Sequence, residues 1–216
     1  VYTSGTCGRA RGVVHAHRAI WARRMMWDGW YGLTGDDRLL HAGAFNWTYT
    51  LGTGLMDPWA AGATALIPAA GTPAGDLPDL LVENRATIFA AAPGVYRRML
   101  RADIPPLPTL RHGLSAGEKL PDATRTHWQD ATGTEIHEAF GMSECSTFIS
   151  GSPARPAPPG TLGFAQPGRR VAILKDGAPA SVNAPGVIAI HRDDPGLMLG
   201  HPGDAPLSGD WFATGD

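Results

Sequence analysis

The stretch Val-Tyr-Thr-Ser-Gly-Thr-Cys-Gly-Arg-Ala-Arg-Gly-Val-Val-His, residues 1–15, organises the prediction of both the fold and the site. A short β-prone start leads into a loop rich in glycine, hydroxyl side chains and arginine. Glycine lets successive backbone N–H groups point into one concavity, and hydroxyl and guanidinium groups add donors suited to phosphate oxygens. The stretch therefore predicts an anion-binding loop, although a polar glycine-rich turn has the same composition.

Beyond this loop, helix-like and strand-like segments alternate along the chain. We expect helices over residues 16–30 and 121–131, with two more beginning near Asp76 and at Pro93. Strands are expected at residues 38–42, 64–67, 86–91, 110–114 and 135–139. Because strands and helices alternate at this spacing, residues 1–151 are predicted to form an α/β core with a mostly parallel sheet and flanking helices.

The character of the sequence changes near residue 152. A proline-rich segment, residues 153–159, leads into two apolar runs at residues 171–174 and 187–190, the first of which ends in a Lys-Asp-Gly turn. These signals favour antiparallel strands joined by a hairpin. Residues 152–216 are therefore predicted to form a small β-rich subdomain.

Composition excludes several classes of partner. The net charge is −2, 18% of the residues are charged and no long basic run is present, so the sequence does not indicate a nucleic-acid-binding surface. No apolar stretch approaches the ~18 residues of a membrane span, so we expect no membrane partner. The two cysteines, Cys7 and Cys145, do not suggest a disulfide framework, and a cytoplasmic location is the default expectation. The chain lacks an initiator Met and is expected to be part of a longer protein.

One motif suggests a serine hydrolase. Gly113-Leu114-Ser115-Ala116-Gly117 matches the nucleophile elbow, in which a serine stands on a sharp turn between a strand and a helix. Pro121 falls where that helix would be in its second turn, and proline there removes a backbone donor. Ser115 stays an alternative nucleophile, and a surface turn before a helix is the third interpretation of this stretch.

A second polar motif follows a predicted strand. In Glu138-Ala139-Phe140-Gly141-Met142-Ser143-Glu144, an aromatic ring, a glycine and a hydroxyl precede a carboxylate. Such a group at the end of a strand suits a ligand bound at the carboxyl edge of a sheet. Taken alone, Glu144 is better explained as a solvated acid than as a ligand-binding group.

These motifs together resemble those of the adenylate-forming superfamily, which includes acyl-CoA synthetases, and are most similar to its benzoate-CoA ligase branch. The first loop is similar to the family's Tyr-Thr-Ser-Gly-Thr-Thr-Gly-x-Pro-Lys-Gly, with Cys7, Ala10 and Arg11 in place of Thr, Pro and Lys. Residues 138–144 resemble its Tyr-Gly-x-Thr-Glu motif, and residues 214–216 resemble its Thr-Gly-Asp motif. The resemblance implies an adenylate-forming enzyme's large domain, present here in part.

The resemblance also implies roles for individual residues. The catalytic residues would be Thr6, Arg11, Ser143 and Glu144, and Glu144 would bind Mg²⁺. Phe140 would lie against adenine, and Asp216 would bind the ribose hydroxyls. The full set implied to bind ATP is Thr3, Ser4, Gly5, Thr6, Cys7, Gly8, Ser115, Ala116, Gly117, Glu118, Glu138, Phe140, Gly141, Met142, Ser143 and Asp216.

An acyl pocket is implied between residues 46 and 55. Trp47, Thr48, Tyr49 and Gly52 stand where the aryl-CoA ligases place acyl-pocket residues. Aromatic rings offer flat apolar walls, so an aryl or cyclic acid is expected, although Trp47 and Tyr49 would also serve as ordinary core residues.

The implied reaction joins a carboxylic acid to ATP as an acyl-adenylate and then transfers the acyl group to coenzyme A. The implied cofactors are therefore ATP, Mg²⁺ and coenzyme A. Neither lysine of the chain, Lys119 or Lys175, lies in a pattern like the catalytic lysine of the family's C-terminal domain, so that domain is expected to be missing. A non-catalytic fragment that binds nucleotide is the remaining alternative, and the oligomeric state is not predicted.

Overall fold

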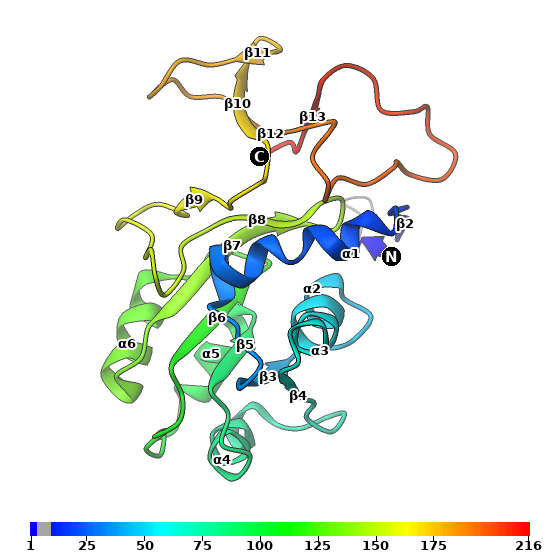
Figure 1. Ribbon diagram of the computed structural model, residues 1–216. Helices are drawn as coiled ribbons and strands as arrows, with labels where there is room; N and C mark the ends of the chain where they lie inside the picture. The colour runs from blue at the N-terminus through cyan, green and yellow to red at the C-terminus, as the bar shows by residue number, and fades with distance from the viewer. Residues whose placement is uncertain (4–9) are drawn as a thin grey trace.

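A seven-stranded sheet forms the body of the computed structural model, which describes residues 1–3 and 10–216 (Figure 1). Its strand order is β4-β3-β5-β6-β7-β8-β9. The neighbouring pairs among β3 to β7 are parallel, while β8 and β9 add antiparallel strands at one edge. The predicted mostly parallel sheet is confirmed. The strands are β3 Arg38–Ala42, β4 Thr64–Leu66, β5 Ile88–Ala91, β6 His112–Ala116, β7 Ile136–Met142, β8 Ser146–Ser150 and β9 Phe164–Ala165.

Helices cover both faces of this sheet (Figure 1). One face packs against the apolar side chains of α4 Leu77–Glu83, α5 Pro93–Met99 and α6 Asp122–Thr132. The other face packs against η1 Trp27–Tyr31 and α2 Thr48–Leu51. The remaining helical segments are α1 Arg18–Ala22, η2 Gly52–Met56, α3 Asp57–Ala61 and the single turn η3 Ala74–Asp76.

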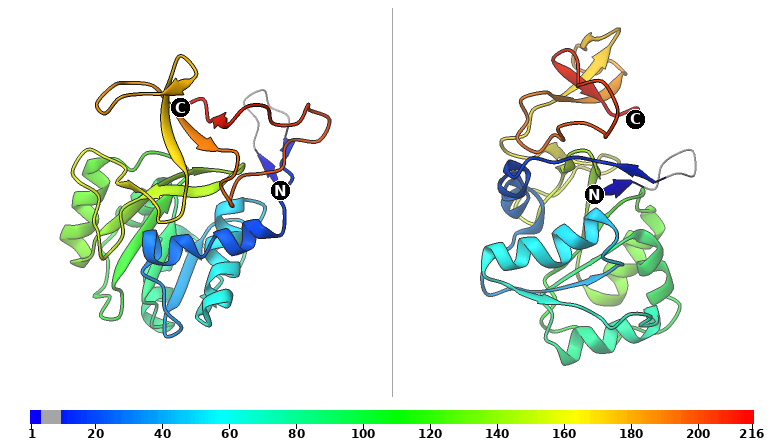
Figure 2. Two further views of the ribbon diagram at one scale, coloured as in Figure 1. Left: turned by 45° about the horizontal axis from the view of Figure 1, so that its top comes forward. Right: turned by 90° about the vertical axis from the view of Figure 1, so that its right-hand side faces the viewer.

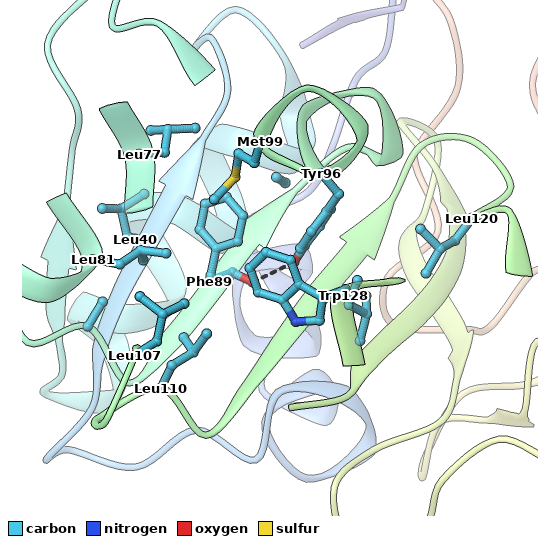
Figure 3. Packing of buried hydrophobic residues seen from close by; sticks show 13 residues of the cluster. Leu40, Leu77, Leu81, Phe89, Tyr96, Met99, Leu107, Leu110, Leu120 and Trp128 are labelled. Carbon is cyan, nitrogen blue, oxygen red and sulfur yellow. Dashed lines mark hydrogen bonds between the residues drawn. The ribbon is translucent and has the colours of Figure 1, made fainter. Parts of the chain in front are cut away.

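Three aromatic rings form the centre of the core beneath α5 and α6 (Figure 3). Phe89 stacks on Trp128 with ring centroids 5.9 Å apart, and Tyr96 meets Trp128 edge-on at 4.9 Å. The Tyr96 hydroxyl donates to the carbonyls of Phe89 and Leu114, at 3.0 and 3.1 Å. Because the phenol satisfies its polar atom on two strand carbonyls, Tyr96 fixes α5 against β5 and β6 at little desolvation cost.

A separate four-stranded sheet follows the large one. It consists of β10 Val171–Lys175, β11 Ala178–Pro179, β12 Val187–His191 and β13 Trp211–Ala213, in the order β11-β10-β12-β13. All its pairs are antiparallel, as predicted. Asp176 and Gly177 take φ values of 51° and 81°, the left-handed pair that a tight hairpin turn requires.

The N-terminal segment lies against the last third of the chain (Figure 2). The short strands β1 Tyr2–Thr3 and β2 Arg11–Gly12 pair as a hairpin. After them, Val14 accepts a hydrogen bond from Leu199 at 2.7 Å and donates one to Gly200 at 3.0 Å. A buried cluster that includes Val13 and Ile190 joins this segment to β8 and to the small sheet.

Local details differ from the sequence predictions at three places. The expected helix over residues 16–30 is divided between α1 and η1, and Gly29 in η1 lies directly against Gln166 and Pro167. The expected strand at residues 110–114 begins two residues later, because its pairing register with β5 starts at His112. Asp76 makes no side-chain capping bond, since a turn of 3-10 helix already leads into α4.

The predicted boundary between residues 1–151 and 152–216 stays a prediction. The large sheet takes its last strand, β9, from beyond residue 152, and the small sheet begins at Val171. Within residues 1–3 and 10–216, no helix is both long enough and apolar enough to cross a membrane.

Trp128 offers a test of the core. Trp128→Ala removes a side chain with no exposed surface and should lower the free energy of unfolding by ~3–5 kcal/mol, because the lost burial and the remaining cavity both destabilise. Urea denaturation followed by circular dichroism measures this change. Trp59→Ala, at a tryptophan that is 66% exposed, is the control and should shift the unfolding free energy by under about 0.5 kcal/mol. Equal effects of the two substitutions would contradict this description of the core.

Candidate active site

A small cavity of about 60 Å³ lies at the carboxyl ends of the parallel strands. One part of its wall is the segment that begins α2, with Trp47, Thr48 and Tyr49. The rings of Trp47 and Tyr49 meet edge-on, with centroids 5.2 Å apart. Tyr49 is buried, and its hydroxyl donates to the carbonyl of Leu114 in β6 at 3.3 Å, so the aromatic wall is anchored to the sheet.

The facing residues of the cavity come from the ends of β6 and β7. They are Ala116, Gly117, Gly141, Met142 and Ser143, all of which the sequence motifs predicted as part of an ATP site. The structure thus brings the predicted acyl residues and part of the predicted nucleotide residues to one cavity.

Glycine is required where these walls meet. Gly117 has a φ of +97°, and a Cβ added there would lie 2.5 Å from Cη2 of Trp47. A side chain at this position would collide with the indole and strain the backbone. The hydroxyls of Thr48 and Ser143 are 3.3 Å apart, which gives a second direct link between the two walls.

The turn between β7 and β8 is held through its backbone carbonyls. Nε2 of His15 contacts the carbonyl of Ser143 at 2.7 Å, so this nitrogen carries the proton and donates. The amide of Met198 donates to the carbonyl of Glu144 at 2.7 Å. Burial lowers the pKa of His15, which opposes the raising effect of this bond and favours the neutral imidazole.

A buried arginine holds the rest of the turn. Arg169 donates from Nη2 to the carbonyl of Cys145 at 2.9 Å and from Nη1 to the carbonyl of Thr147 at 2.8 Å. Its Nε bonds both carboxylate oxygens of Asp194, at 3.0 and 3.1 Å. Both side chains are at most 1% exposed, so the pair fixes β8 relative to the loop that precedes the last strand.

Glu144 is a nearly buried carboxylate at this turn. Its Oε1 lies 3.6 Å from Nε2 of His201, whose Nδ1 contacts the carbonyl of Gly12 at 2.7 Å. In the described part of the chain, no group of three or more His, Cys, Asp or Glu side chains is placed to hold a metal ion by itself. A single carboxylate still fits Mg²⁺ bound together with ATP, because Mg²⁺ takes most of its ligands from phosphates and water in such sites.

The cavity is bordered by a buried network of charged and polar side chains. The sequence motifs did not reveal this network. Arg23, which lines the cavity, bonds the carboxylate of Asp57 through Nε at 2.8 Å and through Nη2 at 2.6 Å. The hydroxyl of Tyr31 donates to the same carboxylate at 2.7 Å. Burial opposes the charge on Arg23, but Asp57 and Tyr31 outweigh it and raise the pKa of the guanidinium. A lone arginine in a predicted helix gives no such signal, because its partner is 34 residues away.

Several predicted site residues are engaged elsewhere. Glu138 accepts from the amide of Leu120 at 2.8 Å and pairs with Arg125 at 3.0 Å. Glu118 accepts from the amide of Gly94 at 3.2 Å. None of these residues lines the cavity.

Three further predicted residues also lie outside the cavity lining. Phe140 packs edge-on against Phe148, with centroids 5.4 Å apart. Gly52 is buried, and a side chain there would collide with the guanidinium of Arg23. Asp216 is exposed, and its carbonyl accepts from Ile188 at 2.9 Å.

Ser115 does not form a nucleophile elbow. It lies within strand β6, it is fully buried, and its Oγ has no hydrogen-bond partner among the described residues. The next helix, α6, begins only at Asp122. An exposed serine on a strand-to-helix turn is therefore not built here, and the hydrolase interpretation is not favoured.

The predicted phosphate loop is only partly described. Thr3 and Arg11 are paired residues of the β1–β2 hairpin, and Arg11 forms an exposed ion pair with Asp204. The predicted residues Ser4, Gly5, Thr6, Cys7 and Gly8 lie outside the described residues.

A larger hollow of about 460 Å³ lies elsewhere, along the chain from Asp204 to Ala213 and beside Arg192 and Leu197. None of the predicted site residues lines it, although Trp211, Phe212 and Ala213, which precede the Thr-Gly-Asp motif, do.

The fold is that of an α/β protein with a small cavity at the carboxyl edge of its parallel strands, the edge at which such sheets bind ligands. The chain belongs to the AMP-binding enzyme family, whose family model matches residues 1–201. It is similar to the 3-hydroxybenzoate–CoA ligase of Aromatoleum sp. (strain CIB), with 31% identity over 196 residues, 88% of this chain and 37% of that protein. It is also similar to the benzoate–CoA ligase of Thauera aromatica, with 29% identity over 230 residues, 100% of this chain and 43% of that protein.

Solved structures agree with this assignment. The anthranilate CoA ligase AuaEII, in complex with anthranoyl-AMP, matches with a TM-score of 0.86 and 27% identity, over 100% of this chain and 43% of that one. ATP-bound MatB from Rhodopseudomonas palustris matches with a TM-score of 0.89 and 25% identity, over 100% of this chain and 44% of that one. The predicted fold, a part of the large domain of an adenylate-forming enzyme, is confirmed. The chain spans about two fifths of the length of the relatives it matches.

His41 supplies a pH test of the packing behind Tyr49. Its ring meets Tyr49 edge-on with centroids 4.4 Å apart, and neither ring nitrogen has a partner in the described residues. Burial lowers the pKa of His41 to about 3, so below pH 6.5 the unfolded chain takes up a proton that the folded chain does not. The free energy of unfolding is therefore unaffected by His41 above pH 6.5, and it falls as the pH drops below that value.

When the pH is lowered from 7 to 5, the unfolding free energy of the wild-type chain should fall by about 2 kcal/mol more than that of His41→Phe, because only the wild-type chain has this histidine. Urea denaturation of both proteins at the two pH values measures the difference. Other titrating groups, such as His112, contribute alike to both proteins. The same loss in both proteins would mean that His41 is protonated in the folded state.

Proposed function

We propose that the complete protein is an ATP-dependent acid–thiol ligase, which activates an aryl or cyclic carboxylic acid as an acyl-adenylate and transfers the acyl group to coenzyme A. The observation that carries this proposal is the cavity in which Trp47 and Tyr49 face Gly117, Gly141 and Ser143. An acyl group and the phosphate that activates it must meet at one place, and this cavity joins the two predicted sets of residues.

The proposed chemistry assigns a role to each wall. A carboxylate is a poor electrophile. When its oxygen attacks the α-phosphate of ATP and pyrophosphate leaves, the acyl carbon acquires AMP as a good leaving group, which the thiol of coenzyme A then displaces. The protein contributes mainly position and charge compensation. Trp47 and Tyr49 would hold the ring of the acid, and Ser143 would donate to the α-phosphate. The cavity of about 60 Å³ leaves no room for a long alkyl chain.

The phosphates and nucleoside would be bound by the other predicted residues. Thr6 and Arg11 would contact the phosphates, and Asp216 the ribose. Glu144 would hold Mg²⁺, which neutralises phosphate charge when bound. In this proposal residues 1–151 form the ATP- and acyl-binding core, residues 152–216 bring Asp216 to the ribose, and the protein acts in the cytoplasm.

The relatives' names support an aromatic acid, since they include ligases named for benzoate, 3-hydroxybenzoate and anthranilate. A pyrophosphate exchange assay of the complete protein with a panel of aryl, cyclic and fatty acids tests the proposal. We expect exchange with aryl or cyclic acids and little with long fatty acids. ATP binding without exchange for any acid would instead favour a non-catalytic nucleotide-binding protein.

Glu144 gives a sharper test. Glu144→Gln keeps the shape of the side chain but removes the charge, so pyrophosphate exchange by the complete protein should fall by on the order of 100-fold. A matched control is Glu83→Gln, since Glu83 is an exposed residue at the end of α4 and does not line the cavity. Equilibrium titration of Mg²⁺ in the presence of ATP should show weaker binding to Glu144→Gln. A loss of exchange under about threefold would mean that Glu144 is only a structural acid.

A further inference from the structure

Besides Thr48 and Ser143, whose hydroxyls bond each other, four polar side chains line the cavity: Arg23, Thr53, Ser146 and Thr147. An aromatic acid that binds in this cavity would therefore meet hydrogen-bonding groups as well as apolar rings. Which groups remain free to bind a substrate depends on the bonds that each already makes.

Two of the four side chains have their hydroxyls committed. The hydroxyl of Thr53 shares a hydrogen bond with Tyr31 at 2.8 Å. The hydroxyl of Thr147 donates to the sulfur of Met26. These two residues shape the cavity but offer little further hydrogen bonding.

Arg23 and Ser146 each retain a donor. Of the five N–H groups of Arg23, those on Nε and Nη2 face Asp57 and Tyr31, and one on Nη1 goes to the oxygen of Ser146. The second hydrogen on Nη1 and the hydroxyl hydrogen of Ser146 have no partner among the described residues. The cavity is thus rich in donors at this point, which favours a ligand that presents an acceptor.

The charge of Arg23 is already compensated. Its side chain is 10% exposed and that of Asp57 is 3% exposed, so the two charges are paired out of reach of solvent. A second carboxylate on the substrate would add an unpaired negative charge to this buried region, at a large desolvation cost. A neutral acceptor, such as a hydroxyl group on the ring, meets the free donors without that cost.

We propose that Arg23 and Ser146 bind a hydroxyl substituent of the substrate, so that the preferred acid is a hydroxylated aryl acid rather than the unsubstituted acid or an aryl dicarboxylic acid. This inference rests on the proposed function, because it takes the cavity as the acyl site. It assigns specificity to two residues that lie outside the sequence motifs of the family.

The backbone conformation of Ser146 is unusual for a residue other than glycine. Ser146 has a φ of +63°, a conformation that non-glycine residues take at a cost and that is frequent at functional sites. The bond from Arg23 and the anchored carbonyls on either side, at Cys145 and Thr147, hold it there.

The test is pyrophosphate exchange by the complete protein with benzoate, the three hydroxybenzoates and the benzenedicarboxylates. The wild-type protein should prefer at least one hydroxybenzoate over benzoate by about tenfold or more in kcat/KM. Ser146→Ala should remove most of that preference and leave kcat/KM for benzoate within about threefold of wild type. Arg23→Lys, which keeps the charge facing Asp57, should do the same.

Ser150→Ala is the matched control. Ser150 is also a buried serine of β8, with its hydroxyl bonded to Gly29 and Gln166, but it does not line the cavity. It should leave the preference unchanged even where it lowers the melting temperature. Equal use of benzoate and hydroxybenzoates by the wild-type protein, or a preference that survives both Ser146→Ala and Arg23→Lys, would overturn this inference while leaving the proposed function in place. Exchange with none of the acids would overturn both.

Discussion

The backbone of the turn between β7 and β8 is the constraint on which the site depends. Its carbonyls at residues 143–145 accept from donors of remote segments, which are His15 near the N-terminus, Met198 near the C-terminus and the buried guanidinium of Arg169. A buried carbonyl without a donor is costly, so the turn takes this shape only when all these segments are docked. The β7–β8 turn fixes the positions of Ser143 and Glu144 at the site. The site is therefore a product of long-range packing.

The same contacts join the two ends of the chain around the site. His201 lies between the side chain of Glu144 and the carbonyl of Gly12, where the N-terminal hairpin returns from the predicted phosphate loop. A shift of that hairpin would move the partner of Glu144 as well. Glycines allow the close approach on the opposite side, where Trp47 lies against Gly117. Bulk at that contact would separate the acyl wall from the nucleotide wall.

Much of the fold followed from periodicity and turn chemistry. The buried parallel strands are short apolar runs between helices, and Pro93 and the Asp176-Gly177 turn appear where local geometry requires them. Residues 48–61 form successive helical segments for which the local sequence predicts no structure, and Gly52 and Gly54 in them lie against Arg23 and His41. Such packing depends on residues far away in sequence and leaves no local pattern.

Only the residues of the candidate site that belong to sequence motifs could be predicted from the sequence. Residues 115–117 and 141–143 were singled out from their patterns, and the cavity gathers most of them. Arg23 and Ser146 were not, because a single arginine and a single serine carry no periodicity and their pairing spans 123 residues. Glu138 shows the opposite case: its motif suggested a ligand contact, but its carboxylate is bonded to Leu120 and Arg125.

The central claim is that the acyl group and the α-phosphate meet at the cavity between Trp47 and the β7–β8 turn. A crystal structure of the complete protein with an aryl-adenylate tests it most directly. We expect the ring to lie in the cavity against Trp47 and Tyr49, with the phosphate beside Ser143. A ring bound instead in the larger hollow along residues 204–213, or against Ser115, would contradict it.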